Sequence, residues 1–300
     1  MRLPRGVPRA MRHLRRALVR TDELERLYRL LEAAGRIEGR QLDQIGSKRL
    51  ADREFTVYSQ SGEDGILHFL VRAVTAPQCV FVEFGVGDYR EANTRFLALN
   101  DGWSGLVMDS SADNVRAIRD DPAYWRMNVT ATQAFVTREN VNTLIAGQDI
   151  TGEIGLLSID IDGNDYWVLE AIDVISPAIL VIEYNSRFGP DRAVTIPYDP
   201  AFDRFRAHYS GLYAGASLKA IYRLARRKGY SFVGCNSFGV NAFFVRDDLV
   251  SDNVRIVDVE EGFVAGQFRE SRTADGQLAY LSRPEEEEIL ARLPVVEIDA

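Results

Sequence analysis

The chain has 300 residues, of which 46% are hydrophobic and 27% charged, a composition typical of a globular protein that can bury a substantial core. No apolar run reaches the roughly 18 residues of a membrane-spanning helix, which argues against an integral membrane protein. The net charge of −8 repels phosphate backbones, so nucleic acid is not an expected partner. Cys79 and Cys235 lie in apolar runs and form no disulfide framework or zinc motif, which favours buried thiols in a reducing cytoplasm.

The first 20 residues differ from the acidic remainder of the chain. Seven arginines precede the first acid, Asp22, and no apolar core of a secretory signal lies among them. Two interpretations stay open: a frayed basic tail leading into a helix, and peripheral attachment to an anionic membrane surface or partner. Residues 21–46 have apolar residues at helical spacing, with Thr21 at the N-cap position and Gly46 after the end. We assign residues 1–50 to an accessory segment.

From about residue 55 the sequence alternates between short apolar runs and helical segments. The apolar runs lie at 79–84, 105–109, 154–161 and 178–184, and the helical segments at 91–100, 112–119, 139–146 and 165–173. Such runs are typical of strands buried on both faces of a parallel sheet. The alternation predicts a doubly wound α/β fold.

The carboxyl-terminal part changes this rhythm. A helix is expected at 216–228, followed by strands at 230–235 and 241–246 that are joined by a short turn and must therefore pair antiparallel. A parallel sheet that ends in an antiparallel hairpin resembles class I methyltransferases rather than dinucleotide-binding dehydrogenases. We assign residues 51–250 to one catalytic domain and 251–300 to an acidic extension, with a short helix opening at residues 285–288.

The strongest local motif is VEFGVGD, which follows the first expected strand. Gly85 and Gly87 lack a Cβ atom and allow the backbone to turn sharply beside a ligand. Glu83 would repel a pyrophosphate but could accept a hydrogen bond from a ligand's ammonium, and Arg90 replaces the third glycine of the dinucleotide motif. The pattern favours S-adenosylmethionine (SAM) over NAD.

Two further elements accompany this loop. Asp109 ends the second strand, a little over 20 residues after the glycines, where a carboxylate can bind ribose hydroxyls. Upstream, the segment YSQSGEDG offers Gln60 to a ligand, while Ser61 is in position to cap a helix.

Five segments in this order resemble the FkbM-like branch of SAM-dependent methyltransferases, which are often associated with glycan or natural-product pathways. They are YSQSGEDGIL, FVEFGVGDYREANT, GWSGLVMD, LLSIDIDGNDYWVLEAI and VIEYN, and the resemblance covers about residues 55–250. It implies a Rossmann-like, seven-stranded α/β sheet with an antiparallel C-terminal hairpin, and it matches Glu83, Gly85 and Gly87 to the SAM loop and Asp109 to the ribose acid. Where the family has Asp-Val/Ile-Glu-Gly after the fourth strand, this chain has Asp-Ile-Asp-Gly-Asn-Asp.

Acidic side chains follow the fourth and fifth strands, whose carboxyl ends should border the methyl donor. Asp162 is the expected general base for an acceptor hydroxyl, and Glu183 is expected to converge on the same pocket. Asp160 is assigned to cofactor binding. His208 lies in an aromatic and polar segment, 199–215, that could wall the substrate site, and it is the next catalytic candidate.

A divalent metal is the rival explanation for the same acids. Mg²⁺ prefers oxygen ligands, and Asp160, Asp162, Glu183 and Asn185 resemble in placement the ligands of catechol and macrocin O-methyltransferases. A third interpretation is a loop that hydrogen-bonds to itself.

The sequence therefore predicts a SAM-dependent O-methyltransferase acting on a sugar, glycan or natural-product hydroxyl. The alternatives are a non-catalytic scaffold on the same fold and a nucleotide- or nucleotide-sugar-binding enzyme.

Overall fold

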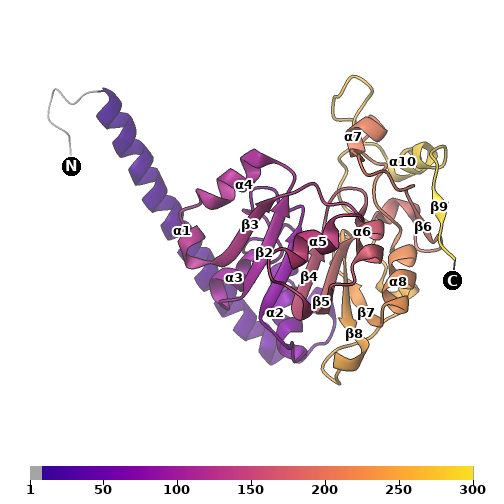
Figure 1. Ribbon diagram of the computed structural model, residues 1–300, viewed down its shortest axis with the longest axis horizontal. Coiled ribbons are helices and arrows are strands. Elements are labelled where there is room, and N and C mark those ends of the chain that lie inside the picture. The colour runs from indigo at the N-terminus through magenta and orange to yellow at the C-terminus, as the bar shows by residue number, and fades with distance from the viewer. Residues whose placement is uncertain (1–8, 300) are drawn as a thin grey trace.

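The computed structural model describes residues 9–299, with side chains from residue 25 onward (Figure 1). Its centre is a seven-stranded sheet in the order β3-β2-β1-β4-β5-β8-β7. The strands are β1 (Val80–Phe84), β2 (Ser104–Asp109), β3 (Asn128–Gln133), β4 (Gly152–Ile159), β5 (Ile175–Glu183), β7 (Tyr230–Cys235) and β8 (Asn241–Arg246). The first five are parallel, and β8 pairs antiparallel with both β5 and β7. The predicted fold class is confirmed.

Helices cover both faces of this sheet and bury two separate apolar clusters. One face is covered by α2 (Glu63–Ala73), α3 (Arg95–Asn100) and α4 (Ala112–Arg119). The other is covered by α5 (Val141–Ala146), α6 (Asp165–Ala171) and α8 (Leu218–Arg227). Because both faces are covered, the central strands are largely apolar, and this is why they are recognisable in the sequence as continuous runs.

The order of the strands in the sheet determines where a ligand can bind. The chain moves outward from β1 through β2 to β3, then returns to the other side of β1 as β4. Loops that leave β1 and β4 therefore diverge to opposite faces, and the carboxyl ends of these two strands leave a crevice between them.

Three sequence expectations at this level were incomplete or wrong. The run NVTATQ, which forms β3, was not recognised, because β3 lies at the sheet edge and its residues alternate between buried and exposed positions. Cys79 is exposed, whereas Cys235 is buried as expected. Helix α2 is capped by Gly62, with φ +89°, and not by Ser61, whose backbone N–H donates to Glu63 instead.

Helix α1 (Arg9–Ile45) is longer than predicted. It includes residues 9–20, so Thr21 is not its N-cap and this stretch is not a frayed tail. Residues 1–8 lie outside the described part of the chain. Glu32 anchors the helix to the domain through an ion pair with Arg126 (2.9 Å) and a hydrogen bond from the Tyr58 hydroxyl (3.0 Å). Among the described residues no helix is long and apolar enough to cross a membrane.

The carboxyl-terminal segment folds onto the end of the domain. Strand β9 (Val296–Glu297) pairs with β6 (Val194–Thr195), and α9 (Val259–Gly262) packs against α8 and β7. The expected helix at 285–288 is present as α10 (Arg283–Leu290), with a capping box between Ser282 and Glu285. The short helix α7 (Arg204–Ala207) lies in the connection between β6 and α8. The boundaries at residues 50 and 250 stay predictions.

Candidate functional site

Three adjoining cavities open at the carboxyl ends of β1 and β4. We name them by their walls: the C-terminal cavity, which reaches residues 266–270; the glycine-loop cavity, beside residues 85–93; and the β2–β3 cavity, beside residues 108–114 and 134–136. Their volumes are about 350, 360 and 310 Å³. Gly85 and Asp160 line all three, so the cavities meet at the crevice that the strand order creates.

The two glycines of the loop serve different purposes. Gly85 has φ +76°, and a Cβ atom there would lie 1.5 Å from the backbone oxygen of Asp160. Gly87 also has positive φ, +55°, but a Cβ atom would meet nothing within 4 Å. Gly85 therefore permits the close approach of two strand ends, whereas Gly87 leaves open space between the glycine-loop and β2–β3 cavities.

Glu83 lies at the tip of β1, but its carboxylate is already engaged. It accepts hydrogen bonds from the backbone N–H groups of Asn93 (2.9 Å) and Thr94 (3.1 Å) and from the Thr94 hydroxyl. Burial raises the pKa of Glu83 to about 7, although these hydrogen bonds act in the opposite direction. The residue borders the glycine-loop cavity while holding the chain at the entry to α3.

Asp109 ties the second strand to the glycine loop. One carboxylate oxygen accepts a hydrogen bond from the Gly87 N–H (2.9 Å), and the other accepts from Ser111 N–H (2.8 Å) and the Asn114 side chain (2.9 Å). The residue borders the β2–β3 cavity together with the half-exposed ring of Phe135. Phe135 was not predicted as a site residue because it follows β3, a strand that was not recognised from the sequence.

The segment before α2 brings Gln60 to the wall shared by the C-terminal and glycine-loop cavities. Buried acids fix this segment. Asp64 accepts hydrogen bonds from three successive backbone N–H groups, those of residues 57–59, and Glu63 accepts from the side chains of Asn236 and Asn241. The segment YSQSGEDG, residues 58–65, thus joins the amino-terminal part of the domain to the β7–β8 hairpin.

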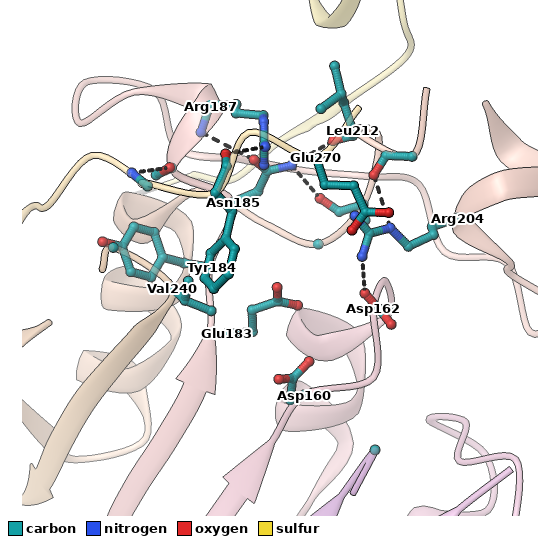
Figure 2. A pocket seen from close by; sticks show the side chains of 18 of the residues that line it. Asp160, Asp162, Glu183, Tyr184, Asn185, Arg187, Arg204, Leu212, Val240 and Glu270 are labelled. Atoms are coloured by element: carbon teal, nitrogen blue, oxygen red, sulfur yellow. Dashed lines mark hydrogen bonds and ion pairs between the residues drawn. The ribbon is translucent and has the colours of Figure 1, made fainter. Parts of the chain in front are cut away.

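Asp160 and Glu183, from the ends of β4 and β5, form a carboxyl pair at the base of the C-terminal cavity. Figure 2 shows the carboxyl group of Asp160 directed toward that of Glu183. Burial raises the pKa of both carboxyls well above the usual range, and the nearby charges of Asp162 and Asp165 raise them further. Two half-buried carboxyls whose charges interact disfavour double ionisation, so the pair retains a proton more strongly than isolated acids do.

Asp162 is directed elsewhere. It adopts φ +56°, and its carboxylate pairs with the Arg204 guanidinium at 2.5 Å (Figure 2). Arg204 also donates to the backbone oxygen of Gly211 (3.0 Å), which fixes the guanidinium against the cavity wall. Asp162 is therefore in an ion pair, whereas among the described residues neither Asp160 nor Glu183 forms one.

The rest of the acidic loop is held partly by its own hydrogen bonds and partly by a bond to a distant segment. Asp165 accepts hydrogen bonds from the backbone N–H groups of Ile161 (2.8 Å) and Gly163 (2.9 Å), and Asn164 donates to the backbone oxygen of Asp199 (2.7 Å). These two residues shape the turn that carries Asp160 and Asp162.

The geometry gives no support to the metal interpretation. The Asn185 side-chain amide donates to the backbone oxygens of Leu212 and Ala214 (both 2.9 Å), and its oxygen accepts from the Arg187 N–H. In the described part of the chain, no group of three or more His, Cys, Asp or Glu side chains is placed to hold a metal ion. Asp162 is occupied by Arg204, which leaves only the Asp160–Glu183 pair.

His208 is not brought to the acids. Its ring lies against Tyr209 (4.3 Å between centroids), its Nδ1 atom is 2.8 Å from the Ser210 hydroxyl, and it lines none of the three cavities. The C-terminal cavity is instead walled by residues that sequence reasoning did not single out, namely Arg187, Arg204, Phe268 and Glu270. Phe268 and Glu270 follow no strand and belong to no motif, so no local signal could have identified them.

The chain has recognisable similarity to known proteins. A family model described as "Methyltransferase FkbM domain" matches residues 60–232. No curated protein sequence matches the chain. Among solved structures, a S-adenosylmethionine-dependent methyltransferase from Clostridium acetobutylicum is 10% identical with a TM-score of 0.40, covering 61% of this chain and 90% of its own. An O-methyltransferase from Bacillus cereus in complex with SAH (S-adenosylhomocysteine) is 16% identical with a TM-score of 0.40, covering 69% and 88% respectively.

Sequence identities of 10% and 16% to these two structures carry no information about the substrate of this chain. The match to the family model, in contrast, extends over more than half of the chain and includes Gly85, Gly87, Asp109 and the acids after β4 and β5. The chain belongs to the FkbM methyltransferase domain family, and its methyl donor is SAM.

Proposed function

We propose that the protein transfers a methyl group from SAM to a hydroxyl of a sugar, glycan or natural product held in the C-terminal cavity. The observation that carries the proposal is the meeting of the three cavities at Gly85 and Asp160, directly beside the Asp160–Glu183 pair. A donor that fills two cavities would present its methyl group to an acceptor in the third.

The residues present suit the donor. The amino acid end would lie in the glycine-loop cavity, near Gln60 and Glu83, and the nucleoside in the β2–β3 cavity, with Asp109 at the ribose. The open space beside Gly87 supports this arrangement, because a side chain there would project between the two cavities. When bound, SAM supplies an electrophilic methyl group on a sulfonium.

The Asp160–Glu183 pair is suited to receive the acceptor's proton. As the hydroxyl oxygen forms its bond to the methyl carbon, the carbon–sulfur bond breaks, sulfur retains the electron pair, and the hydroxyl proton passes to the pair. A sugar hydroxyl is far less acidic than a carboxyl, so proton removal must accompany methyl transfer. This assignment moves the base from Asp162, our first choice from sequence, to the pair, and leaves Asp162 to position Arg204.

Polar groups in the C-terminal cavity favour a hydroxylated acceptor. Its wall carries the guanidinium groups of Arg187 and Arg204 and the carboxylate of Glu270. Arg187 is held by Glu286 (3.1 Å) and by the backbone oxygen of Phe268 (3.2 Å), which makes it a rigid donor. Donors and acceptors arranged around a small cavity are typical of sites that bind polyols.

The test is methyl transfer over a panel of sugars, glycans and hydroxylated natural products, measured as SAH release, with SAH binding followed by calorimetry. Asp160→Asn and Glu183→Gln should retain SAH binding and lose turnover by roughly 100-fold or more. Asp162→Asn should have a smaller effect, because it acts through Arg204. Asp113→Asn, a matched change at an exposed acid, should be neutral.

A non-catalytic scaffold on this fold gives a different result. It would bind SAH and yet methylate no member of the panel, and both pair variants would behave as wild type. Wild-type turnover in Asp160→Asn and Glu183→Gln, with an acceptor that is methylated, would place the base elsewhere.

We also propose a cytoplasmic location, in which the arginines of residues 1–20 bind an anionic membrane surface. The two free cysteines suit a reducing compartment. Seven arginines without an acid, on a chain of net charge −8, suit an anionic partner.

A further inference from the structure

Helix α1 packs Tyr28 and Leu42 against the domain but leaves several of its other large apolar residues in solvent. The exposed fractions are 49% for Leu27, 68% for Leu30, 37% for Leu31 and 57% for Ile37. Together with exposed Ala34, these residues lie three or four apart and form one face of the helix, which we call the leucine stripe. The helical spacing of the apolar residues predicts a shared face but not the direction in which that face points.

The opposite face of α1 is fixed to the domain by close contacts. Glu32 is buried with its partners Tyr58 and Arg126. A Cβ atom on Gly35 would lie 2.4 Å from the Val57 side chain, and one on Gly39 would lie 2.6 Å from the His68 ring. The helix therefore cannot rotate to bury the leucine stripe without losing the Glu32 ion pair and inserting side chains where glycines fit.

An apolar stripe held away from its own domain indicates a contact outside it. The stripe covers 11 residues, about 15 Å of helix axis. Five side chains on this length bury far less than the roughly 800 Å² per partner of a stable dimer, so a second copy is not the favoured occupant. A membrane surface needs less apolar area, because basic residues add electrostatic attraction to the insertion of a few leucines.

The distribution of charge along the chain favours an anionic membrane as the surface that the leucine stripe contacts. The seven arginines of residues 1–20 precede the stripe, and α1 joins residues 9–20 to it without interruption. Because this segment contains no acid, the remaining 280 residues are more negative than the whole chain's −8. In Figure 1 the amino-terminal part of α1 extends beyond the domain, so it can reach a surface that the acidic domain does not approach.

We propose that the leucine stripe inserts into an anionic membrane surface and, with the arginines, holds the enzyme there. This inference extends the arginine contact proposed above and is independent of the methyl-transfer chemistry. The leucine stripe would supply the apolar part of the membrane contact, which the electrostatic attraction of the arginines does not provide.

The test uses the full chain and vesicles of phosphatidylcholine with and without phosphatidylserine, with binding measured by co-sedimentation. The variant Leu27→Gln/Leu30→Gln/Leu31→Gln should bind vesicles containing phosphatidylserine about tenfold or more weakly than wild type. The matched control Ile256→Gln/Leu278→Gln changes apolar residues of similar exposure elsewhere and should bind as wild type. SAH affinity, unchanged in both, shows that each variant is folded.

Three results would overturn the proposal. Wild type could ignore vesicles containing phosphatidylserine at low ionic strength. The triple variant could bind as wild type does while deletion of residues 1–20 abolishes binding, which would leave the arginine contact standing alone. Sedimentation could also show a wild-type dimer that the triple variant converts to monomer without any change in vesicle binding, which would assign the stripe to a second copy.

Discussion

The backbone oxygen of Asp160 occupies the space that a side chain on Gly85 would need, with only 1.5 Å between it and the position of a Cβ atom. This contact joins the ends of β1 and β4 where the three cavities meet. Gly85 is therefore needed for the two strand ends to pack together, whereas Gly87 keeps the space beside the loop free of a side chain.

Substituting these glycines should therefore have different consequences. Gly85→Ala must displace backbone, and we expect the free energy of unfolding to fall by roughly 1–3 kcal/mol, together with a loss of SAH affinity. Gly87→Ala meets no atom and should cost only about 1 kcal/mol of left-handed backbone strain, while weakening SAH binding. Chemical denaturation and calorimetry measure the two effects. Equal stability of the two variants would show that the β1 loop moves freely.

Asp109 combines two roles that one pair of substitutions can test. Asp109→Ala removes the anchor of the Gly87 N–H and the proposed ribose acceptor, so SAH affinity should fall by roughly 10- to 100-fold, the scale of lost hydrogen bonds to a charged group. Asp113→Ala removes an exposed acid of α4 and should leave the affinity unchanged. Unaltered SAH binding in Asp109→Ala would remove this residue from the cofactor site.

Glu83 should make stability depend on pH. Burial raises its pKa to about 7 in the folded protein, against an ordinary value of 4.5, so the folded state binds this proton more tightly than the unfolded state. The free energy of unfolding should therefore fall as pH rises from about 4.5 to about 7, by about 3 kcal/mol from this group, and level off above.

Asp64 and Asp165, whose pKa values burial raises to about 6, act in the same direction. The difference in unfolding free energy between wild type and Glu83→Gln isolates the Glu83 contribution. A difference that stays constant from about pH 5 to about pH 8, a range that includes the folded-state pKa of about 7, would mean that Glu83 is ionised throughout.

A chelator should distinguish the carboxyl pair from a metal centre. Asn185 is engaged with backbone groups and Asp162 with Arg204, so we expect turnover to be unchanged by EDTA and unchanged by added Mg²⁺. Activity that disappears in EDTA and returns with Mg²⁺ would restore the metal interpretation and require Asp162 to leave Arg204.

The sequence by itself determined the sheet and the loop beside β1. Strands buried on both faces are continuous apolar runs, and the Gly85–Gly87 spacing requires only neighbouring residues, so both are local signals. It could not reveal β3, whose alternating edge pattern is weak over six residues.

Only the tertiary structure decided which acids meet and which way α1 faces. Asp160 and Asp162 follow β4 and Glu183 ends β5, yet Arg204, 42 residues beyond Asp162, pairs with Asp162 and leaves the other two acids as a pair. Likewise, helical spacing shows that Leu27, Leu30 and Leu31 share a face, but Gly35 and Gly39 decide that the opposite face meets the domain. In both cases the outcome depends on a partner distant in sequence, and periodicity along one segment carries no information about that partner.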